Sequence, residues 1–241
     1  MTKIKALIKL LTNPHYSFEN KVQFILFYFH NRKDVIHIFK EIFIDEDYYI
    51  PLRNPKLIID CGSNIGSTIF YFHELYPNAH IVGVEPSINN FNKLVENCNT
   101  FHVPASVENV ALSDKEGYME FYDHKTKGST SVLNEKNAAK KGLENYNVYK
   151  VKVKKLSEYI NSTIDLLKID VEGSEYEILK DLDKSEKLQK IRNIVMEYHV
   201  EKSGKITEIA EILQRNKFDY QIGSFQGTHY ILKCKNLVPL Q

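Results

Sequence analysis

Asp60-Cys61-Gly62-Ser63-Asn64-Ile65-Gly66 is the most informative stretch of this sequence. Before it, Leu57-Ile58-Ile59 is an uninterrupted apolar run, typical of a parallel strand that is covered on both faces. After it, residues 67–76 have a helical pattern that stops at Tyr76-Pro77. A glycine-rich turn between a strand and a helix lets the backbone approach a ligand closely, and the free amides at the helix start point toward that ligand.

A second apolar run, Ile81-Val82-Gly83-Val84, predicts the next strand and places Glu85 at its end. An acidic residue about 20 positions after such a turn is well placed to accept hydrogen bonds from both hydroxyls of a ribose. The turn and the acid together predict a site for a cofactor that contains adenosine.

From Lys56 onward, strand and helix patterns alternate, which indicates a mostly parallel sheet with helices on both faces. Two further segments flank a glycine-containing turn and predict a closing antiparallel hairpin. We therefore predict an α/β fold: a Rossmann-like, doubly wound, mostly parallel seven-stranded sheet with a C-terminal antiparallel hairpin. Further strands are expected at 107–112, 118–122, 148–153, 164–169 and 191–196, the hairpin at 218–222 and 229–234, and helices at 89–98, 177–182 and 206–214.

The chain divides into an N-terminal helical extension, residues 1–55, and one α/β domain, residues 56–241. Within the extension, Ile4, Leu7, Ile8 and Leu11 form a helical stripe. This stripe suits either weak contact with a membrane surface or packing against the main domain, and the shortness of the piece favours packing. The polar, lysine-rich segment 123–147 is expected to be a long loop with a helical piece.

Composition excludes several classes of function. Thirty-two basic and 31 acidic residues give no global field that would attract nucleic acid. Three scattered cysteines do not form a zinc or disulfide pattern, so we expect a reducing, cytoplasmic location. No segment approaches the about 20 apolar residues of a transmembrane helix, and the N-terminal sequence does not match a secretory signal.

Three segments resemble the class I S-adenosylmethionine-dependent methyltransferases and, more narrowly, the FkbM family. They are the 60–66 stretch, Val84-Glu85-Pro86, and Leu167-Lys168-Ile169-Asp170-Val171-Glu172-Gly173-Ser174-Glu175. Asn64 stands where other methyltransferases have a glycine, and the FkbM pattern has asparagine there. The resemblance extends from Lys56 to the C-terminus. It implies an O-methyltransferase that uses S-adenosyl-L-methionine and acts on a hydroxyl, or occasionally a carboxyl, of a sugar, glycan, polyketide or similar small metabolite.

The resemblance also implies which residues hold the cofactor. Asp60 suits the ammonium group, directly or through water, Glu85 suits the ribose, and Asp170 suits the methionine end or the acceptor. The expected cofactor-binding residues are Asp60, Gly62, Ser63, Asn64, Ile65, Gly66, Glu85, Pro86, Ser87, Ala111, Leu112 and Asp170. Ser113, Ser129, Thr130 and Ser131 are further candidate contacts.

A hydroxyl group is a poor nucleophile, so a general base is expected near the acceptor. His199 is the first candidate because histidine titrates near neutral pH, and Glu172 and Asp170 are the other expected catalytic residues. The acids Asp170, Glu172 and Glu197 suit a divalent ion, but their spacing is not a metal signature, so we predict no metal.

Two other functions are compatible with parts of the sequence. The first is a nicotinamide-dependent Rossmann oxidoreductase. Against it, Asn64 replaces a glycine where the backbone would meet a pyrophosphate, and Asp60 would bring negative charge close to the phosphates. The second is a non-catalytic cofactor-binding protein, which the polar residues expected on the acceptor side argue against. The acceptor and the oligomeric state are not predicted.

Overall fold

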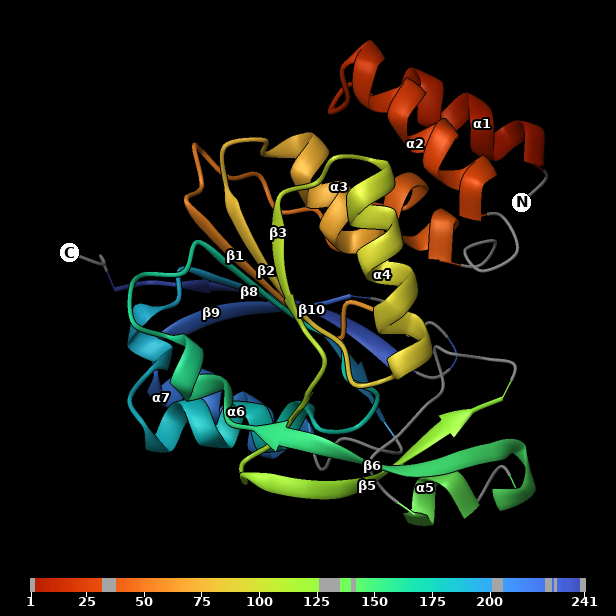
Figure 1. Ribbon diagram of the computed structural model, residues 1–241. Helices are drawn as coiled ribbons and strands as arrows, with labels where there is room; N and C mark the ends of the chain where they lie inside the picture. Colours follow the sequence, from red (N-terminus) through yellow and green to blue (C-terminus); the bar gives the residue numbers. More distant parts are fainter. Residues whose placement is uncertain are drawn as a thin grey trace.

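A seven-stranded sheet with the order β3-β2-β1-β7-β8-β10-β9 forms the centre of the computed structural model (Figure 1). The structure describes residues 3–31, 38–125, 135–139, 142–200, 206–223, 227 and 229–238. The strands of the sheet are β1 (Leu57–Cys61), β2 (His80–Val84), β3 (Ala105–Glu108), β7 (Leu166–Ile169), β8 (Asn193–His199), β9 (Phe218–Ile222) and β10 (His229–Asn236). The first five in the order run parallel, whereas β10 is antiparallel to both of its neighbours. The predicted fold class and closing hairpin are confirmed.

Helices cover both faces of this sheet because successive side chains of its central strands alternate between two cores. Ile58 and Leu166 pack in one cluster with α3 (Ser67–Leu75) and α4 (Ile88–Thr100). Ile59 and Leu167 pack in the other with α6 (Glu175–Lys184) and α7 (Ile206–Arg215). The central strands are buried on both sides, which explains their continuous apolar sequence.

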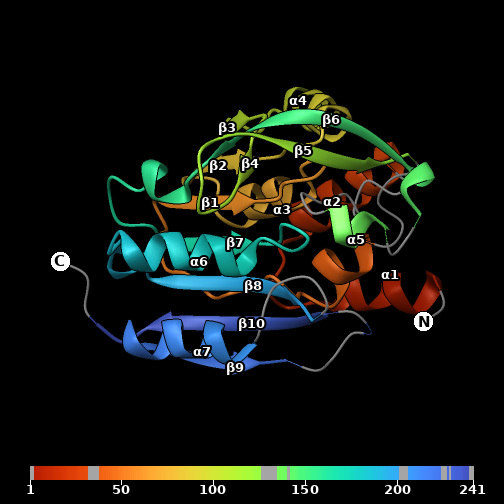
Figure 2. The same ribbon diagram turned by 90° about the horizontal axis from the view of Figure 1, so that it is seen from below.

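A second, three-stranded sheet was not predicted. Its strands are β4 (Ala111–Leu112), β5 (Gly117–His124) and β6 (Tyr146–Lys154), in the order β4-β6-β5. In Figure 1, β5 and β6 lie below the main sheet, and in Figure 2 they lie on the side of that sheet where β2 and β3 are. The expected strand 107–112 is divided at Asn109, whose side-chain amide donates to the carbonyl oxygens of Glu85 and Pro86, at 2.8 and 3.0 Å. The strand therefore leaves the main sheet at the edge where β2 ends.

The remaining helical elements are short, except at the N-terminus. The structure has α1 (Lys3–Thr12), α2 (Phe18–Asn31), α5 (Glu135–Ala139), a π-helical turn η1 (Lys40–Ile44), and the 3₁₀ turns η3 (Leu143–Asn145), η4 (Leu156–Tyr159) and η5 (Leu188–Lys190). Ser129, Thr130 and Ser131 lie outside the described residues.

The N-terminal helices lie beside α3 and share its hydrophobic core (Figure 1). The ring of Phe27 stacks on Phe70, with 4.5 Å between the ring centroids. In α1, Leu10 is buried, whereas Ile8 and Leu11 of the predicted stripe are exposed. Among the described residues, no helix has both the length and the apolar character required to cross a bilayer.

Candidate active site

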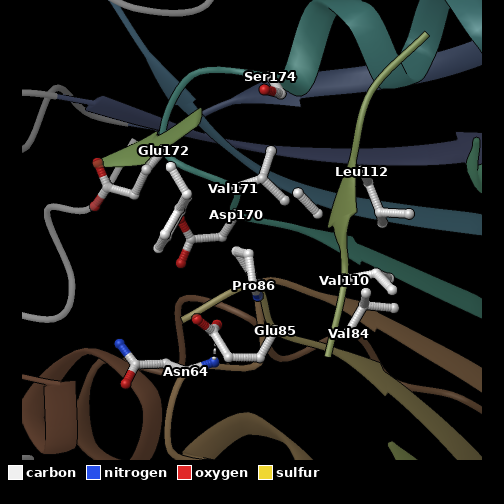
Figure 3. Close-up of a pocket in the computed structure, with 13 residues that line it drawn as sticks. Asn64, Val84, Glu85, Pro86, Val110, Leu112, Asp170, Val171, Glu172 and Ser174 are labelled. Carbon is white, nitrogen blue, oxygen red and sulfur yellow. Dashed lines mark hydrogen bonds between the residues drawn. The ribbon is translucent and has the colours of Figure 1, made fainter. Parts of the chain in front are cut away.

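A cavity of about 630 Å³, measured with its open mouth, lies at the carboxyl ends of β1, β2 and β7 (Figure 3). Ligands of open α/β sheets bind in this position. The cavity is lined by Gly62, Asn64, Val84, Glu85, Pro86, Val110, Ala111, Leu112, Phe121, Asp170, Val171, Glu172 and Ser174. It therefore combines one apolar side with several carboxylates.

The glycine-rich turn after β1 packs against the ends of both neighbouring strands. The amides of Gly62 and Ser63 donate to the carbonyl oxygen of Val84, each at 3.0 Å. Gly62 has φ of +81°, and a Cβ atom there would lie 1.7 Å from the carbonyl oxygen of Asp170. The position therefore requires glycine, and the turn presents mainly backbone to the cavity.

Glu85 ends β2 as a buried carboxylate that is only 5% exposed. Its Oε2 accepts a hydrogen bond from the backbone amide of Asn64 at 2.8 Å, and its Oε1 accepts one from that of Ser87 at 2.9 Å. Burial raises the pKa of Glu85 to about 7, although the two amides favour the charged form. A carboxylate has about four acceptor positions, so Glu85 retains capacity for hydroxyl donors in the cavity.

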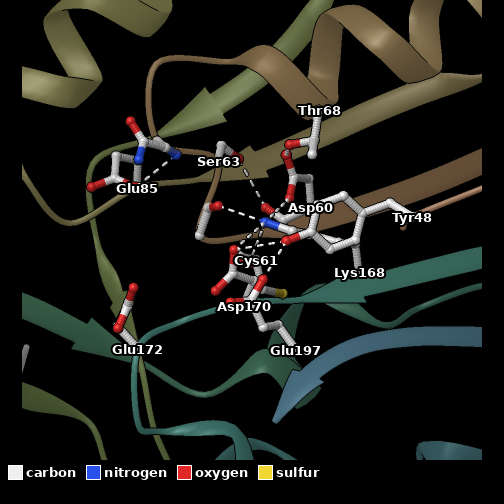
Figure 4. A network of polar contacts seen from close by, with 12 residues as sticks. Tyr48, Asp60, Cys61, Ser63, Thr68, Glu85, Lys168, Asp170, Glu172 and Glu197 are labelled. Atoms are coloured by element: carbon white, nitrogen blue, oxygen red, sulfur yellow. Dashed lines mark hydrogen bonds and ion pairs between the residues drawn. The ribbon is translucent and has the colours of Figure 1, made fainter. Parts of the chain in front are cut away.

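Asp60 lies beneath the glycine-rich turn and does not line the cavity. Its Oδ1 is 3.1 Å from the Nζ atom of Lys168, and its Oδ2 accepts a hydrogen bond from Thr68 (Figure 4). Lys168 also donates to the carbonyl oxygen of Gly62, at 2.7 Å. Burial alone would lower the pKa of Lys168, but Asp60 and Asp170 raise it above its ordinary value, so the side chain is charged. Asp60 therefore pairs with this buried lysine, and the lysine holds the turn through the carbonyl oxygen of Gly62.

Lys168 was not predicted to belong to the site, although its place within a buried apolar strand could have indicated it. It is the charged residue in β7, whose four residues are all buried. A lysine is almost never fully buried unless it is paired, because an isolated buried charge is costly. Such a residue in a strand of this kind predicts an acidic partner on a neighbouring strand, and here that partner is Asp60 of β1.

Asp170 follows β7, and its side chain reaches the cavity with 24% of its surface exposed. Tyr48 follows η1, and its hydroxyl lies 3.1 Å from Oδ2 of Asp170 and 2.7 Å from Oε2 of Glu197 (Figure 4). Burial and the nearby charge of Glu197 raise the pKa of Asp170 to about 7. No sequence pattern distinguishes Tyr48 from the other tyrosines, of which the chain has fifteen in all.

His199 ends β8 and does not line the cavity. Its Nδ1 is 2.9 Å from Oε1 of Glu175, and its Nε2 lies 3.3 Å from Glu197 and 3.4 Å from Glu172. Burial would lower the pKa of His199, but these carboxylates raise it to about 11. A protonated imidazole has no lone pair that can accept a proton. For His199 to act as the general base that the sequence suggested, this proton would first have to be lost, so that role stays a prediction.

The other predicted cofactor residues divide into two groups. Gly62, Asn64, Pro86, Ala111 and Leu112 line the cavity. Ser63, Ile65, Gly66, Ser87 and Ser113 do not. The hydroxyl of Ser63 donates to the Asp60 carbonyl oxygen at 2.9 Å, and that of Ser87 caps α4 and donates to Asp123 at 3.0 Å.

The apolar side of the cavity includes residues that the sequence did not indicate. Val84, Val110 and Phe121 contribute to it, and Phe121 comes from the second sheet. Together with the carboxylate of Glu85 and the glycine-rich turn, they match the three parts of an adenosine cofactor that carries an amino acid: an aromatic base, a ribose and a polar tail. The residues present therefore fit S-adenosylmethionine.

Comparison with known proteins is consistent with this geometry. The family model described as the methyltransferase FkbM domain matches residues 60–221. Methyltransferase sdnD of Sordaria araneosa is 32% identical over 212 residues, which cover 76% of this chain and 81% of that protein. The 31-O-demethyl-FK506 methyltransferase FkbM of Streptomyces tacrolimicus is 27% identical over 220 residues, covering 78% and 83%.

The fold also occurs in solved structures. The crystal structure of methyltransferase FkbM from Methylobacillus flagellatus KT superposes with a TM-score of 0.57 at 14% identity. The match covers 96% of this chain but 58% of that longer chain. At this level of identity the likeness is one of fold.

Proposed function

The chain belongs to the FkbM family of methyltransferases, whose cofactor is S-adenosylmethionine, and we propose that it methylates a hydroxyl oxygen of a sugar, a glycan or another small metabolite. The observation that carries the proposal is the cavity itself, which extends from the buried carboxylate of Glu85 to the carboxylates of Asp170 and Glu172. One relative is a 31-O-demethyl-FK506 methyltransferase, so an oxygen is the acceptor in that protein.

The cofactor is proposed to lie along this cavity. Glu85 would accept hydrogen bonds from the ribose hydroxyls, the apolar side that includes Val84 and Phe121 would hold the adenine, and the turn at Gly62 would hold the methionine portion. Asp60 then acts through Lys168, which holds the carbonyl oxygen of Gly62, and it is a positioning residue.

Methyl transfer is an in-line displacement for which the cofactor supplies the reactive methyl group. The acceptor oxygen would gain this methyl group in exchange for its proton, which gives a methyl ether and leaves the cofactor as S-adenosylhomocysteine. We assign the released hydroxyl proton to the carboxylate of Asp170, because it lines the cavity at the tip of β7. Holding the reacting atoms in line lowers the barrier by several kcal/mol.

Isotope transfer tests the function directly. The protein is incubated with S-adenosylmethionine that carries a ¹³C-labelled methyl group and with a panel of sugars, glycans and hydroxylated metabolites. The expected products gain one methyl group, and their NMR spectra show an O-methyl carbon. Cofactor binding without transfer to any member of the panel or to extract fractions would instead identify a non-catalytic binding protein. Membership in the family already argues against the oxidoreductase.

Replacing Glu85 with alanine is expected to weaken S-adenosylhomocysteine binding roughly 10- to 100-fold, because hydrogen bonds to a charged group contribute about 1.5 to 3 kcal/mol. Calorimetry measures the affinity. Glu120→Ala, a change at an exposed carboxylate of β5, is the matched control and should bind as the wild type does. Unchanged affinity in Glu85→Ala would place the ribose elsewhere.

The same carboxylate predicts a pH dependence. Because the pKa of Glu85 is raised to about 7, the group is mostly protonated at pH 6 and mostly ionised at pH 8. Only the ionised form accepts from both ribose hydroxyls, so affinity should increase about tenfold between these pH values. In Glu85→Gln the difference between the two pH values should become smaller. An equal pH dependence in both proteins would assign the titration to another group.

A further inference from the structure

A compact group of side chains with metal-binding atoms lies behind Asp170 and Glu172, beside the cavity. Glu197 and His199 come from β8, and His229 comes from the antiparallel neighbour β10, where it is paired with His199. His199 and His229 are buried, with exposed fractions of 4% and 9%. One ligand atom from each of the three residues lies within 4.8 Å of the others.

We propose that Glu197, His199 and His229 bind one divalent transition-metal ion, which displaces the proton on Nε2 of His199 and assists the methyl transfer from the acceptor side of the cavity. The inference rests on the proposed function for its role, but the site itself is argued from these side chains. These ligands differ from the three acids that the sequence suggested for a divalent ion, because the fold places His229 of β10 next to His199 of β8.

The separations between the side-chain atoms support a common ion. Oε1 of Glu197 lies 3.3 Å from Nε2 of His199 and 2.9 Å from Nδ1 of His229. Two ligands that each bind an ion at about 2.1 Å are roughly 3.0 to 3.4 Å apart when the angle at the ion is between about 90° and 109°. The observed separations are close to this range, so an ion can contact Oε1 and either nitrogen with only small movements.

Two of the ligands are held in orientation by neighbouring groups. Oε1 of Glu175, which is fully buried, lies 2.9 Å from Nδ1 of His199 and directs Nε2 toward Glu197. Tyr48 donates to Oε2 of Glu197, at 2.7 Å, and directs Oε1 toward the histidines. A carboxylate on the second nitrogen of a ligating histidine is a recurrent feature of metal sites, where it fixes the ring and increases its basicity.

The donor set selects the class of ion. Two imidazole nitrogens and one carboxylate suit Zn²⁺ and related transition-metal ions, whereas Mg²⁺ prefers oxygen ligands. Three protein ligands leave a coordination position for water or a substrate oxygen. Glu172 both lines the cavity and lies 3.4 Å from His199. An acceptor hydroxyl bound to the ion would therefore lie near Asp170, and the ion would make that hydroxyl more acidic.

Metal binding to the full chain tests the proposal without any turnover. Protein freed of metal by a chelator is titrated with Zn²⁺ in competition with a chromophoric chelator, and Co²⁺ is used to record the visible absorption of the bound ion. We expect one equivalent to bind. His229→Gln and Glu197→Gln should each weaken binding at least about 100-fold, and Glu175→Gln should weaken it about 10- to 100-fold. Mg²⁺ should not compete.

His80→Gln is the matched control, because His80 is an exposed histidine at the opposite end of β2. It should bind Zn²⁺ as the wild type does. Circular dichroism and S-adenosylhomocysteine binding establish that each variant is folded. Absence of stoichiometric binding in the wild type, or equal affinity in folded His229→Gln, would overturn the site. Methyl transfer by metal-free protein would overturn its role alone, and a metal-bound protein that transfers no methyl group would overturn the proposed function while leaving the site intact.

Discussion

Asp170→Asn is expected to lower the kcat for methyl transfer about 100- to 10,000-fold, the range that general-base catalysis commonly contributes. The substitution keeps the size of the side chain and an oxygen that can accept from Tyr48, which lies 3.1 Å from Oδ2. It removes the carboxylate to which we assign the proton of the acceptor hydroxyl. Affinity for S-adenosylhomocysteine should stay close to that of the wild type, since the ribose is proposed to bind Glu85.

Glu172→Gln is the matched control for this experiment, because Glu172 is the next carboxylate of the same cavity. Steady-state kinetics with the acceptor identified by isotope transfer, together with calorimetry, separates kcat from cofactor affinity. The assignment predicts a much smaller loss of kcat in Glu172→Gln. A larger loss in Glu172→Gln than in Asp170→Asn would transfer the role of base to Glu172.

Lys168→Met is expected to lower the free energy of unfolding by about 3 to 5 kcal/mol, because removing one partner of a buried ion pair leaves the other charge uncompensated. Asp60 is fully buried, and its Oδ1 lies 3.1 Å from the lysine Nζ. The carbonyl oxygen of Gly62 would lose a charged donor at the same time. Denaturant unfolding, followed by circular dichroism, measures the change.

Two further variants distinguish the lost ion pair from lost packing. Adding Asp60→Asn to Lys168→Met removes the stranded charge, so the double variant should be more stable than Lys168→Met alone. Lys152→Met, at an exposed lysine of β6, should change stability by no more than about 0.5 kcal/mol. Equal destabilisation by the single and double variants would show that the lysine contributes through its packing.

The parts of this protein that follow local rules were predictable. The strand, glycine-rich turn and helix around Gly62 depend on residues that are adjacent in sequence, and the position of Glu85 depends on the length of one connection. The central strands were also recognisable, because burial on both faces leaves an uninterrupted apolar pattern. These features define the main sheet and the part of the cavity that Glu85 lines.

The parts that depend on long-range pairing were not predictable in the same way. Whether His199 is a base or a cation depends on Glu175 of α6 and Glu197, and no sequence spacing reports how close three such groups will come. The second sheet depends on the break at Asn109, whose side chain bonds to the end of a different strand. Phe121 lines the cavity because it belongs to this second sheet, so its position could not be predicted either.

Tyr48 shows that the segment matched by the family model and the polar network beside the cavity do not have the same boundaries. The match to the family model starts at residue 60, yet this phenol from upstream lies between two acids at the edge of the sheet beside the cavity. A chimera that carried only residues 60–221 would lack Tyr48, and therefore one member of this polar network.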